Sequence, residues 1–251
     1  MLDGVRLALG TLTILPTGRV EVTRRAAAVA MVVAPLAVLP LAAVVAAAGW
    51  LGPRVSAPDL VTAIAVLGLV ALGTRALHLD GLADTVDGLG ASWDRARALE
   101  VMRRGDTGPM GVVALVLVLG LQAAAAAAIL SRPTGWLTVA ALLCVSRGAL
   151  ALSCARPLRP ARNTGLGAAV IGSVPSWLAV AIWAVLLYVC ALLAHAGGLP
   201  SWHGLLGAAA AAAAVLIMAG WCTRRLGGLT GDVLGATIEL AFAVLLIIFS
   251  L

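Results

Sequence analysis

Three aspartates recur at short intervals in the segment His78-Leu-Asp80-Gly-Leu-Ala-Asp84-Thr-Val-Asp87-Gly. On a helix, side chains at positions i, i+4 and i+7 lie within about 60° of one another, so this spacing places Asp80, Asp84 and Asp87 on one face. Three carboxylates so close together repel one another unless a cation lies between them. Hard divalent ions such as Mg²⁺ take oxygen ligands and commonly bridge carboxylates to substrate phosphates. The segment therefore predicts a Mg²⁺ site, with a solvated acidic helix face as the alternative. His78 lies about 160° round the helix from Asp80, so we expect it to face elsewhere.

Two further polar segments contain residue types that could complete such a site. The first is Arg103-Arg104-Gly-Asp106-Thr-Gly-Pro-Met-Gly111, which offers guanidinium donors, one more carboxylate and glycines that let the backbone approach a phosphate closely. The same composition is typical of an ordinary turn before a helix, which is the alternative interpretation.

The second segment is Arg224-Arg225-Leu-Gly-Gly-Leu-Thr230-Gly-Asp232-Val-Leu-Gly235-Ala-Thr-Ile-Glu239. A glycine-rich turn that enters a helix predicts an anion site, because free N–H groups and the helix dipole point at the ligand. Asp232 and Glu239 are seven residues apart and share a helix face. For the glycines, close packing between helices is an equally simple explanation.

The elements that position these residues are predicted to be membrane helices. Of the 251 residues, 62% are hydrophobic and 11% are charged, against roughly a quarter charged in soluble domains. A soluble globule is therefore excluded, and apolar runs of 18 or more residues are each long enough to cross about 30 Å of hydrocarbon. We expect an all-α, polytopic membrane bundle, a single domain over 1–251, with an interfacial helix in 1–15. About seven spans are expected, at 26–49, 59–76, 110–130, 136–153, 174–194, 204–222 and 233–250.

The basic residues indicate the orientation of this bundle. All seventeen are arginine, and with the N-terminus inside, only Arg54 and Arg132 fall in outer loops, as the positive-inside rule requires. Nucleic acid is excluded as a partner because the arginines are spread among short loops. Arg147 and Glu239 lie inside spans, where charge is costly and indicates pairing or function. Arg147 is close enough to the inner end of its span that its side chain could reach that end by snorkelling.

These motifs resemble those of a known enzyme family, the cobalamin synthases or adenosylcobinamide-GDP ribazoletransferases. The segment His78–Gly90 looks like the family signature, and Gly228–Glu239 resembles its last motif. Between them, Glu100–Gly111, Ser146-Arg147 and Ala161–Gly167 resemble further elements in the same order. Two positions depart from the pattern: Ile14 stands where the family usually has an arginine, and 157–160 diverges locally.

The resemblance implies that α-ribazole, or its phosphate, attacks the cobinamide-linked phosphoryl group of adenosylcobinamide-GDP and that GMP leaves, with Mg²⁺ as cofactor. It implies a multi-pass protein of the inner membrane of a bacterium or archaeon, with a cytoplasmic N-terminus and active site. The lipid bilayer is a further partner, and a homo-oligomer or a complex with other cobalamin-pathway enzymes is expected. The predicted metal ligands are Asp80, Asp84, Asp87, Asp106 and Asp232; the predicted catalytic residues are Asp84, Asp106 and Asp232; the predicted substrate-binding residues are Arg103, Arg104, Arg147, Arg162, Arg224, Arg225, Thr230 and Glu239.

Two other functions remain as alternatives. A CDP-alcohol phosphotransferase also uses a membrane-embedded aspartate cluster, but Asp84 stands where its pattern Asp-Gly-x-x-Ala-Arg has the arginine. A secondary transporter should place ionisable groups near the mid-membrane on broken helices, often within internal repeats. Here the acidic residues crowd one predicted membrane face, and the sequence shows no clear repeat.

Overall fold

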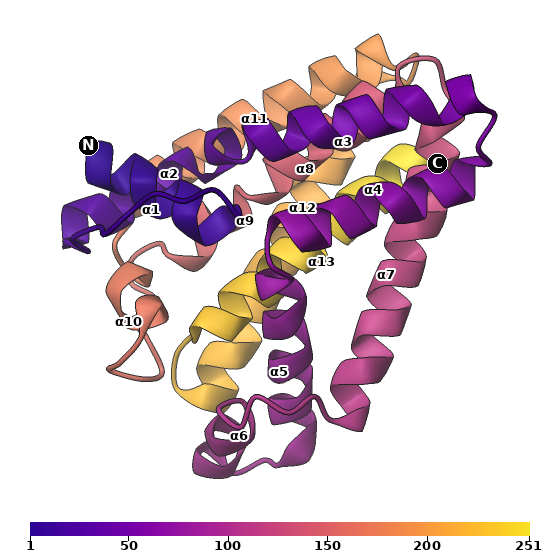
Figure 1. The fold of residues 1–251 in the computed structure, drawn as a ribbon. Coiled ribbons are helices and arrows are strands. Elements are labelled where there is room, and N and C mark those ends of the chain that lie inside the picture. Colours follow the sequence, from indigo (N-terminus) through magenta and orange to yellow (C-terminus); the bar gives the residue numbers. More distant parts are fainter.

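The computed structural model describes residues 1–251, which form an all-α bundle with no β-sheet (Figure 1), as predicted. The helices are α1 (Leu2–Leu12), α2 (Arg24–Ala37), α3 (Leu39–Leu51), the 3-10 turn η1 (Gly52–Val55), α4 (Asp59–Gly73), α5 (Leu77–Ala91), α6 (Arg95–Val101), α7 (Pro109–Leu130), α8 (Gly135–Ser146), α9 (Ala149–Ser153), α10 (Leu166–Val170), α11 (Ser176–Ala196), α12 (Ser201–Leu226) and α13 (Gly231–Ser250).

Six segments are long and apolar enough to cross a membrane, and a seventh is present if α4 and α5 count as one bent span. This agrees with the predicted number. The six are Arg24–Val55, Pro109–Leu130, Gly135–Ser153, Ser176–Ala196, Ser201–Leu226 and Gly231–Ser250. The first span differs from the expected single helix, because the chain breaks at Val38 between α2 and α3. Pro35 inside α2 and Pro40 at the start of α3 account for the break, since proline lacks an N–H to donate and its ring crowds the preceding turn.

Helix α13 is the centre of the bundle and packs against α5, α7, α8, α9 and α12. Its side chains are apolar nearly all round, and Phe242, Leu246 and Phe249 are fully enclosed. A helix that is hydrophobic on every side is expected in the interior, whereas the outer helices keep one face for lipid. Arg132 closes the far end of α13 by donating hydrogen bonds to the carbonyl oxygens of Phe249 (2.7 Å) and Ser250 (3.2 Å).

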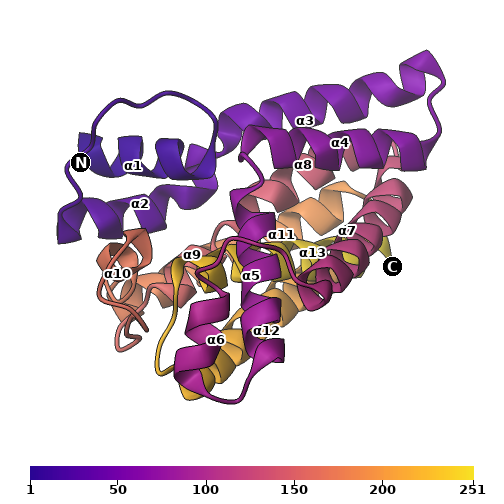
Figure 2. The same cartoon turned by 60° about the horizontal axis from the view of Figure 1, so that its bottom comes forward.

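The other end of the bundle is covered by short elements (Figure 2). Helix α1 lies along α2 and buries Leu7, Ala8 and Leu12 against it, and α10 packs on both α2 and α13. The predicted N-terminal helix is therefore present.

A sharp bend between α4 and α5 positions the aspartate-bearing helix. The two helix axes differ by 89°, and Arg75 (φ 55°) and Ala76 (φ 54°) both adopt the left-handed conformation, which costs an L-residue about 1–2 kcal/mol. Local contacts hold the bend. The Arg75 guanidinium donates to the Gly10 carbonyl (2.6 Å), and the Ile14 N–H donates to the Gly73 carbonyl (2.7 Å). The N-terminal segment thus fixes the direction in which α5 leaves α4.

Candidate active site

Helix α5 carries the three aspartates, as the spacing predicts, but their surroundings differ. Asp80 is exposed, whereas Asp84 and Asp87 are buried. Asp84 lies within electrostatic range of three other carboxylates, those of Asp80, Asp87 and Asp232, and the single opposing charge is that of Arg162. The region is therefore rich in negative charge, which is the condition that a divalent cation relieves.

Glycines allow α5 and α13 to approach closely where they cross. A Cβ on Gly81 would lie 2.6 Å from the carbonyl oxygen of Asp232, and a Cβ on Gly235 would lie 3.1 Å from the backbone of His78. The packing explanation is therefore correct for Gly235. This close approach brings Asp232, at the start of α13, next to the aspartates of α5.

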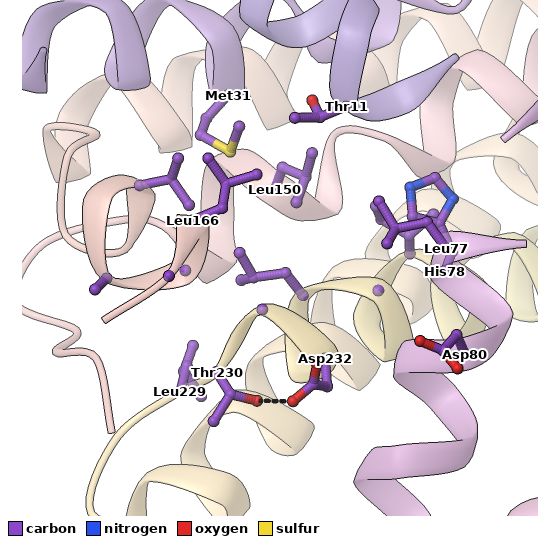
Figure 3. Close-up of a pocket in the computed structure, with 18 of the residues that line it drawn as sticks. Thr11, Met31, Leu77, His78, Asp80, Leu150, Leu166, Leu229, Thr230 and Asp232 are labelled. Carbon is purple, nitrogen blue, oxygen red and sulfur yellow. Dashed lines mark hydrogen bonds between the residues drawn. The ribbon is translucent and has the colours of Figure 1, made fainter. Parts of the chain in front are cut away.

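Asp232 is held in place by its neighbours at the N-terminus of α13 (Figure 3). Thr230 caps the helix by accepting a hydrogen bond from the Val233 N–H (3.3 Å), and its hydroxyl donates to Oδ2 of Asp232 (3.1 Å). The Nη1 atom of Arg162 lies 3.9 Å from the same carboxylate oxygen. The sequence-predicted residues Thr230, Asp232 and Arg162 are therefore brought together.

Arg162 reaches this position because its segment pairs with the turn before α13. The Leu229 N–H donates to the Arg159 carbonyl (2.9 Å), and the Ala161 N–H donates to the Leu229 carbonyl (2.7 Å). The Arg162 Nη2 atom donates to the Leu99 carbonyl (2.6 Å), which leaves Nη1 directed to Asp232 and Nε without a partner.

These residues border a pocket of about 310 Å³ that has a polar and an apolar side. Asp80, Thr230 and Asp232 lie together at one side (Figure 3), and Arg162 also lines the pocket. The apolar lining comes from Leu12 in α1, Met31 in α2, Leu150 in α9, Leu166 in α10, and Leu234 and Ile238 in α13. His78 lines the same pocket as Asp80, but the His78 ring and the Asp80 carboxylate point in different directions (Figure 3), as expected from their spacing. The two side chains do differ in exposure, since His78 is buried and Asp80 is not.

Asp87, a predicted metal ligand, is engaged as a helix cap in this structure. Its Oδ2 accepts a hydrogen bond from the Gly108 N–H (2.7 Å), and its Oδ1 accepts one from the Gly111 N–H (2.8 Å). The donors are the N-cap residue and the third residue of α7, where N–H groups have no partner within the helix and negative charge is favoured. A Cβ on either glycine would collide with the carboxylate. These two glycines therefore leave room for the Asp87 carboxylate, which is a side chain of the protein itself, at the start of α7.

The remaining residues of that motif lie outside the pocket. Glu100 accepts hydrogen bonds from Arg97 and Arg104, each at 2.9 Å, and these bonds hold the pKa of Glu100 below its usual value. Arg103 and Asp106 are exposed in the loop between α6 and α7. Asp106 does not line the pocket that Asp80 and Asp232 share.

The two arginines at the end of α12 differ in what they contact. Arg225 donates to the Ser92 carbonyl (2.8 Å) and lies over the ring of Trp93, 3.8 Å from its centroid. It therefore holds the segment just after α5 against the end of α12. Arg224 is exposed and makes no side-chain hydrogen bond to the protein.

Arg147 and Glu239 are enclosed in the bundle and do not line the pocket. The Nη1 atom of Arg147 donates to the Leu143 carbonyl (3.2 Å) and to the Ser146 hydroxyl oxygen (2.8 Å), while Nε and Nη2 have no partner. Glu239 accepts a hydrogen bond from Gln122 (2.9 Å). Snorkelling of Arg147 is therefore wrong, because its side chain is fully buried.

No three acidic, histidine or cysteine side chains converge closely enough to form a metal cage. Mg²⁺ rarely needs one, because it usually keeps several waters and binds one or two carboxylates together with substrate phosphates. Asp80 and Asp232 border one pocket from two helices, and Asp84 lies in their electrostatic range. This donor set fits a Mg²⁺ ion that is shared with a phosphate-bearing substrate.

Several pocket residues had no signal in the sequence as site residues. Thr11 and Met31 come from the N-terminal helices, far along the chain from the motifs. The segment Gly165–Gly167 also lines the pocket, and a Cβ on Gly167 would lie 2.6 Å from the Gly231 nitrogen. Only the family resemblance singled out that segment beforehand.

Known proteins match this chain along nearly its whole length. The family model described as cobalamin-5-phosphate synthase matches residues 4–250. A protein of Nocardioides sp. named adenosylcobinamide-GDP ribazoletransferase is 46% identical over 248 residues, which cover 98% of each chain. Proteins of the same name from Frankia casuarinae (37% identical, 100% of this chain and 95% of the relative) and Bradyrhizobium diazoefficiens (36%, 97% and 92%) are also similar. No solved structure gives a significant match.

Proposed function

The chain belongs to the cobalamin-5-phosphate synthase family, and we propose that it transfers the cobinamide-linked phosphoryl group of adenosylcobinamide-GDP to α-ribazole or its phosphate. The products are adenosylcobalamin, or its phosphate, and GMP. The observation that carries this proposal is the polar side of the pocket, where carboxylates from α5 and α13 lie beside Arg162. Phosphoryl transfer needs little more from a protein than positioning and charge stabilisation.

In the proposed reaction, a ribose hydroxyl oxygen of the acceptor forms a bond to the cobinamide-linked phosphorus. The bond from that phosphorus to the oxygen bridging it to GMP breaks, and the electron pair leaves on GMP. Asp232 accepts the hydroxyl proton, because the Thr230 hydrogen bond and Arg162 fix its carboxylate at the pocket. Arg162 contacts the phosphate oxygens through Nη1, since its other terminal nitrogen is engaged with Leu99.

Asp80, with Asp84 nearby, would hold Mg²⁺, which leaves Asp232 free to take the proton. When bound, the ion supplies charge neutralisation for the diphosphate oxygens. The exposed Arg103 and Arg224 remain available for the guanine nucleotide's phosphate, whereas Arg225 has a structural contact. We place the pocket on the cytoplasmic side of the inner membrane, because the arginines concentrate at that end of the predicted topology.

The test is GMP release by the purified protein in detergent with adenosylcobinamide-GDP, α-ribazole and Mg²⁺. We expect release that needs all three components, and a fall of about 100-fold or more in Asp232→Asn, within the contribution of a positioned general base. Asp59→Asn is the matched control, because it makes the same change at the first turn of α4, away from the pocket. Arg162→Gln should lose activity, whereas Arg159→Gln, an exposed neighbour that does not line the pocket, should retain it.

Two results would contradict the proposal. Absence of GMP from folded wild-type protein would exclude the reaction, and full turnover in Asp232→Asn would exclude the site. Accumulation of an unchanged substrate in sealed vesicles would instead support transport. Release of CMP from a CDP-alcohol would support the other phosphotransferase.

A further inference from the structure

A buried polar link joins α7 to α13 inside the bundle, away from the pocket. The side-chain amide of Gln122 donates one hydrogen bond to Oε2 of Glu239 (2.9 Å) and another to the Glu239 carbonyl oxygen (3.3 Å). Gln122 is 1% exposed and Glu239 is 4% exposed, and neither lines the pocket. A carboxylate inside a membrane bundle is costly, so its presence indicates pairing or function. The proposed reaction uses neither residue.

The rest of α7 offers little that fixes its register against α13. Gln122 is followed by six consecutive alanines, 123–128, of which Ala123, Ala125 and Ala126 are buried. A surface of alanines has nearly the same shape in neighbouring registers, and in lipid no hydrophobic force between helices chooses among them. No other side-chain hydrogen bond joins α7 to α13. In coiled coils a single buried polar residue specifies the register of paired helices, and the position of Gln122 indicates the same use here.

The register of α13 decides where Asp232 lies relative to α5. Asp232 and Glu239 are seven residues apart on this helix, about 10 Å along its axis, so a slip at Glu239 displaces Asp232 by the same amount. Gly235 lies between them, where a Cβ would be 3.1 Å from the backbone of His78 on α5. The Asp87 carboxylate in turn ties α5 to the N-terminus of α7. Because α5, α7 and α13 all pack on one another, the link between α7 and α13 completes a closed triangle of helices.

We propose that Gln122 and Glu239 are positioning residues, which fix the register of α13 against α7 and so hold Asp232 beside Asp80 at the pocket. This inference rests on the proposed function, in which Asp232 accepts the hydroxyl proton. Glu239 then acts on the reaction without contacting substrate, in place of the substrate-binding role that the family resemblance implies. Since a displacement of about 1 Å can lower a rate about 100-fold, a slip that leaves the bundle folded is enough to lose turnover.

The first test removes the link. Gln122→Leu keeps a side chain of similar size but donates no hydrogen bond, and we expect kcat for GMP release to fall about tenfold or more. KM for α-ribazole and for adenosylcobinamide-GDP should stay unchanged, because the pocket lining is intact. Leu121→Ala is the matched control, since Leu121 is the adjacent residue on α7, is 52% exposed and does not line the pocket. A wild-type kcat in folded Gln122→Leu would overturn the proposal.

The second test exchanges the two residues. Gln122→Glu alone sets two carboxylates against each other without a donor, and kcat should fall as in Gln122→Leu. Adding Glu239→Gln to that variant restores the link in the opposite direction, because the amide is then on α13 and the carboxylate on α7. The exchange also keeps one negative charge in the interior, where the charge of Arg147 acts on Glu239. We expect kcat of the double variant to return to within about threefold of wild type.

The outcomes separate positioning from the other roles of Glu239. If its carboxylate contacted substrate, moving that carboxylate to α7 would leave the double variant inactive, and this result would exclude positioning. If the link only stabilised the fold, Gln122→Leu would unfold at a lower temperature in circular dichroism but keep the wild-type kcat per folded molecule, which would also exclude it. Both comparisons are made against wild-type protein that releases GMP. Absence of GMP from folded wild-type protein would instead refute the proposed function.

Discussion

Replacing Asp87 by asparagine should reduce the stability of the bundle without altering the chemistry of the pocket. Each oxygen of the Asp87 carboxylate accepts one hydrogen bond at the N-terminus of α7, from the N–H groups of Gly108 and Gly111. Asparagine keeps one acceptor and turns its NH₂ group toward the other backbone N–H. One hydrogen bond to a charged group is thus lost, and its N–H is left without a partner.

The magnitude follows from that loss. Hydrogen bonds to charged groups contribute about 1.5–3 kcal/mol, so the free energy of unfolding of Asp87→Asn should fall by about this amount. Asp87→Ala removes both bonds and should be less stable still. Asp80 is exposed and makes no hydrogen bond to the protein, so Asp80→Asn should change stability by no more than about 0.5 kcal/mol.

The assay combines two measurements on each variant in detergent: unfolding followed by circular dichroism, and GMP release against Mg²⁺ concentration. Asp87→Asn should unfold more readily but keep the wild-type Mg²⁺ dependence at a temperature where it is folded. Asp80→Asn should need more Mg²⁺ for half-maximal activity. Wild-type stability together with an altered Mg²⁺ dependence in Asp87→Asn would contradict this prediction, because Asp87 would then be a metal ligand.

Three further predictions concern the crossing of α5 with α13, the buried charges and the topology. Gly81→Ala should lower the free energy of unfolding by about 1–3 kcal/mol and slow GMP release, because the added Cβ meets the Asp232 carbonyl oxygen. Gly68→Ala is the control, since a Cβ there has no neighbour within 4 Å. Equal effects of the two substitutions would contradict this account. In a double-mutant cycle, the variant with both Arg147→Gln and Glu239→Gln should lose about 0.5–3 kcal/mol less unfolding free energy than the two single variants lose in sum, since each charge acts on the other. Strictly additive losses would refute the coupling. A reporter fused to the C-terminus should be external, and a cytoplasmic signal would exclude seven crossings.

The sequence predicts those parts of the fold and site that depend on local patterns. Apolar runs indicate most of the spans, and the spacing of Asp80, Asp84 and Asp87 predicts a helix with these residues on it. The glycine-rich turn before Asp232 predicts the start of a helix, and α13 does begin there, at Gly231. Gly235 could be read as a packing contact, although its partner, the backbone of His78, could not be named.

The rest depends on contacts between distant segments. The role of Asp87 is decided by N–H groups 21 and 24 residues further along the chain. The bend before α5 has no glycine or proline at its two left-handed residues, Arg75 and Ala76, so no local signal marks it. Met31 joins the pocket only because α2 packs against α9 and α10, and a single sequence carries no pattern for that packing.

The composition of the pocket wall also determines when the site can exist during synthesis. Its lining begins with Thr11 and ends with Ile238, so it joins the first helix of the chain to the last. A ribosome-bound chain that lacks α13 has no Asp232 and lacks the pocket-lining residues Leu234 and Ile238. Substrate therefore cannot bind to a partly inserted chain, and loss of the final helix should abolish activity even where the preceding spans have entered the bilayer correctly.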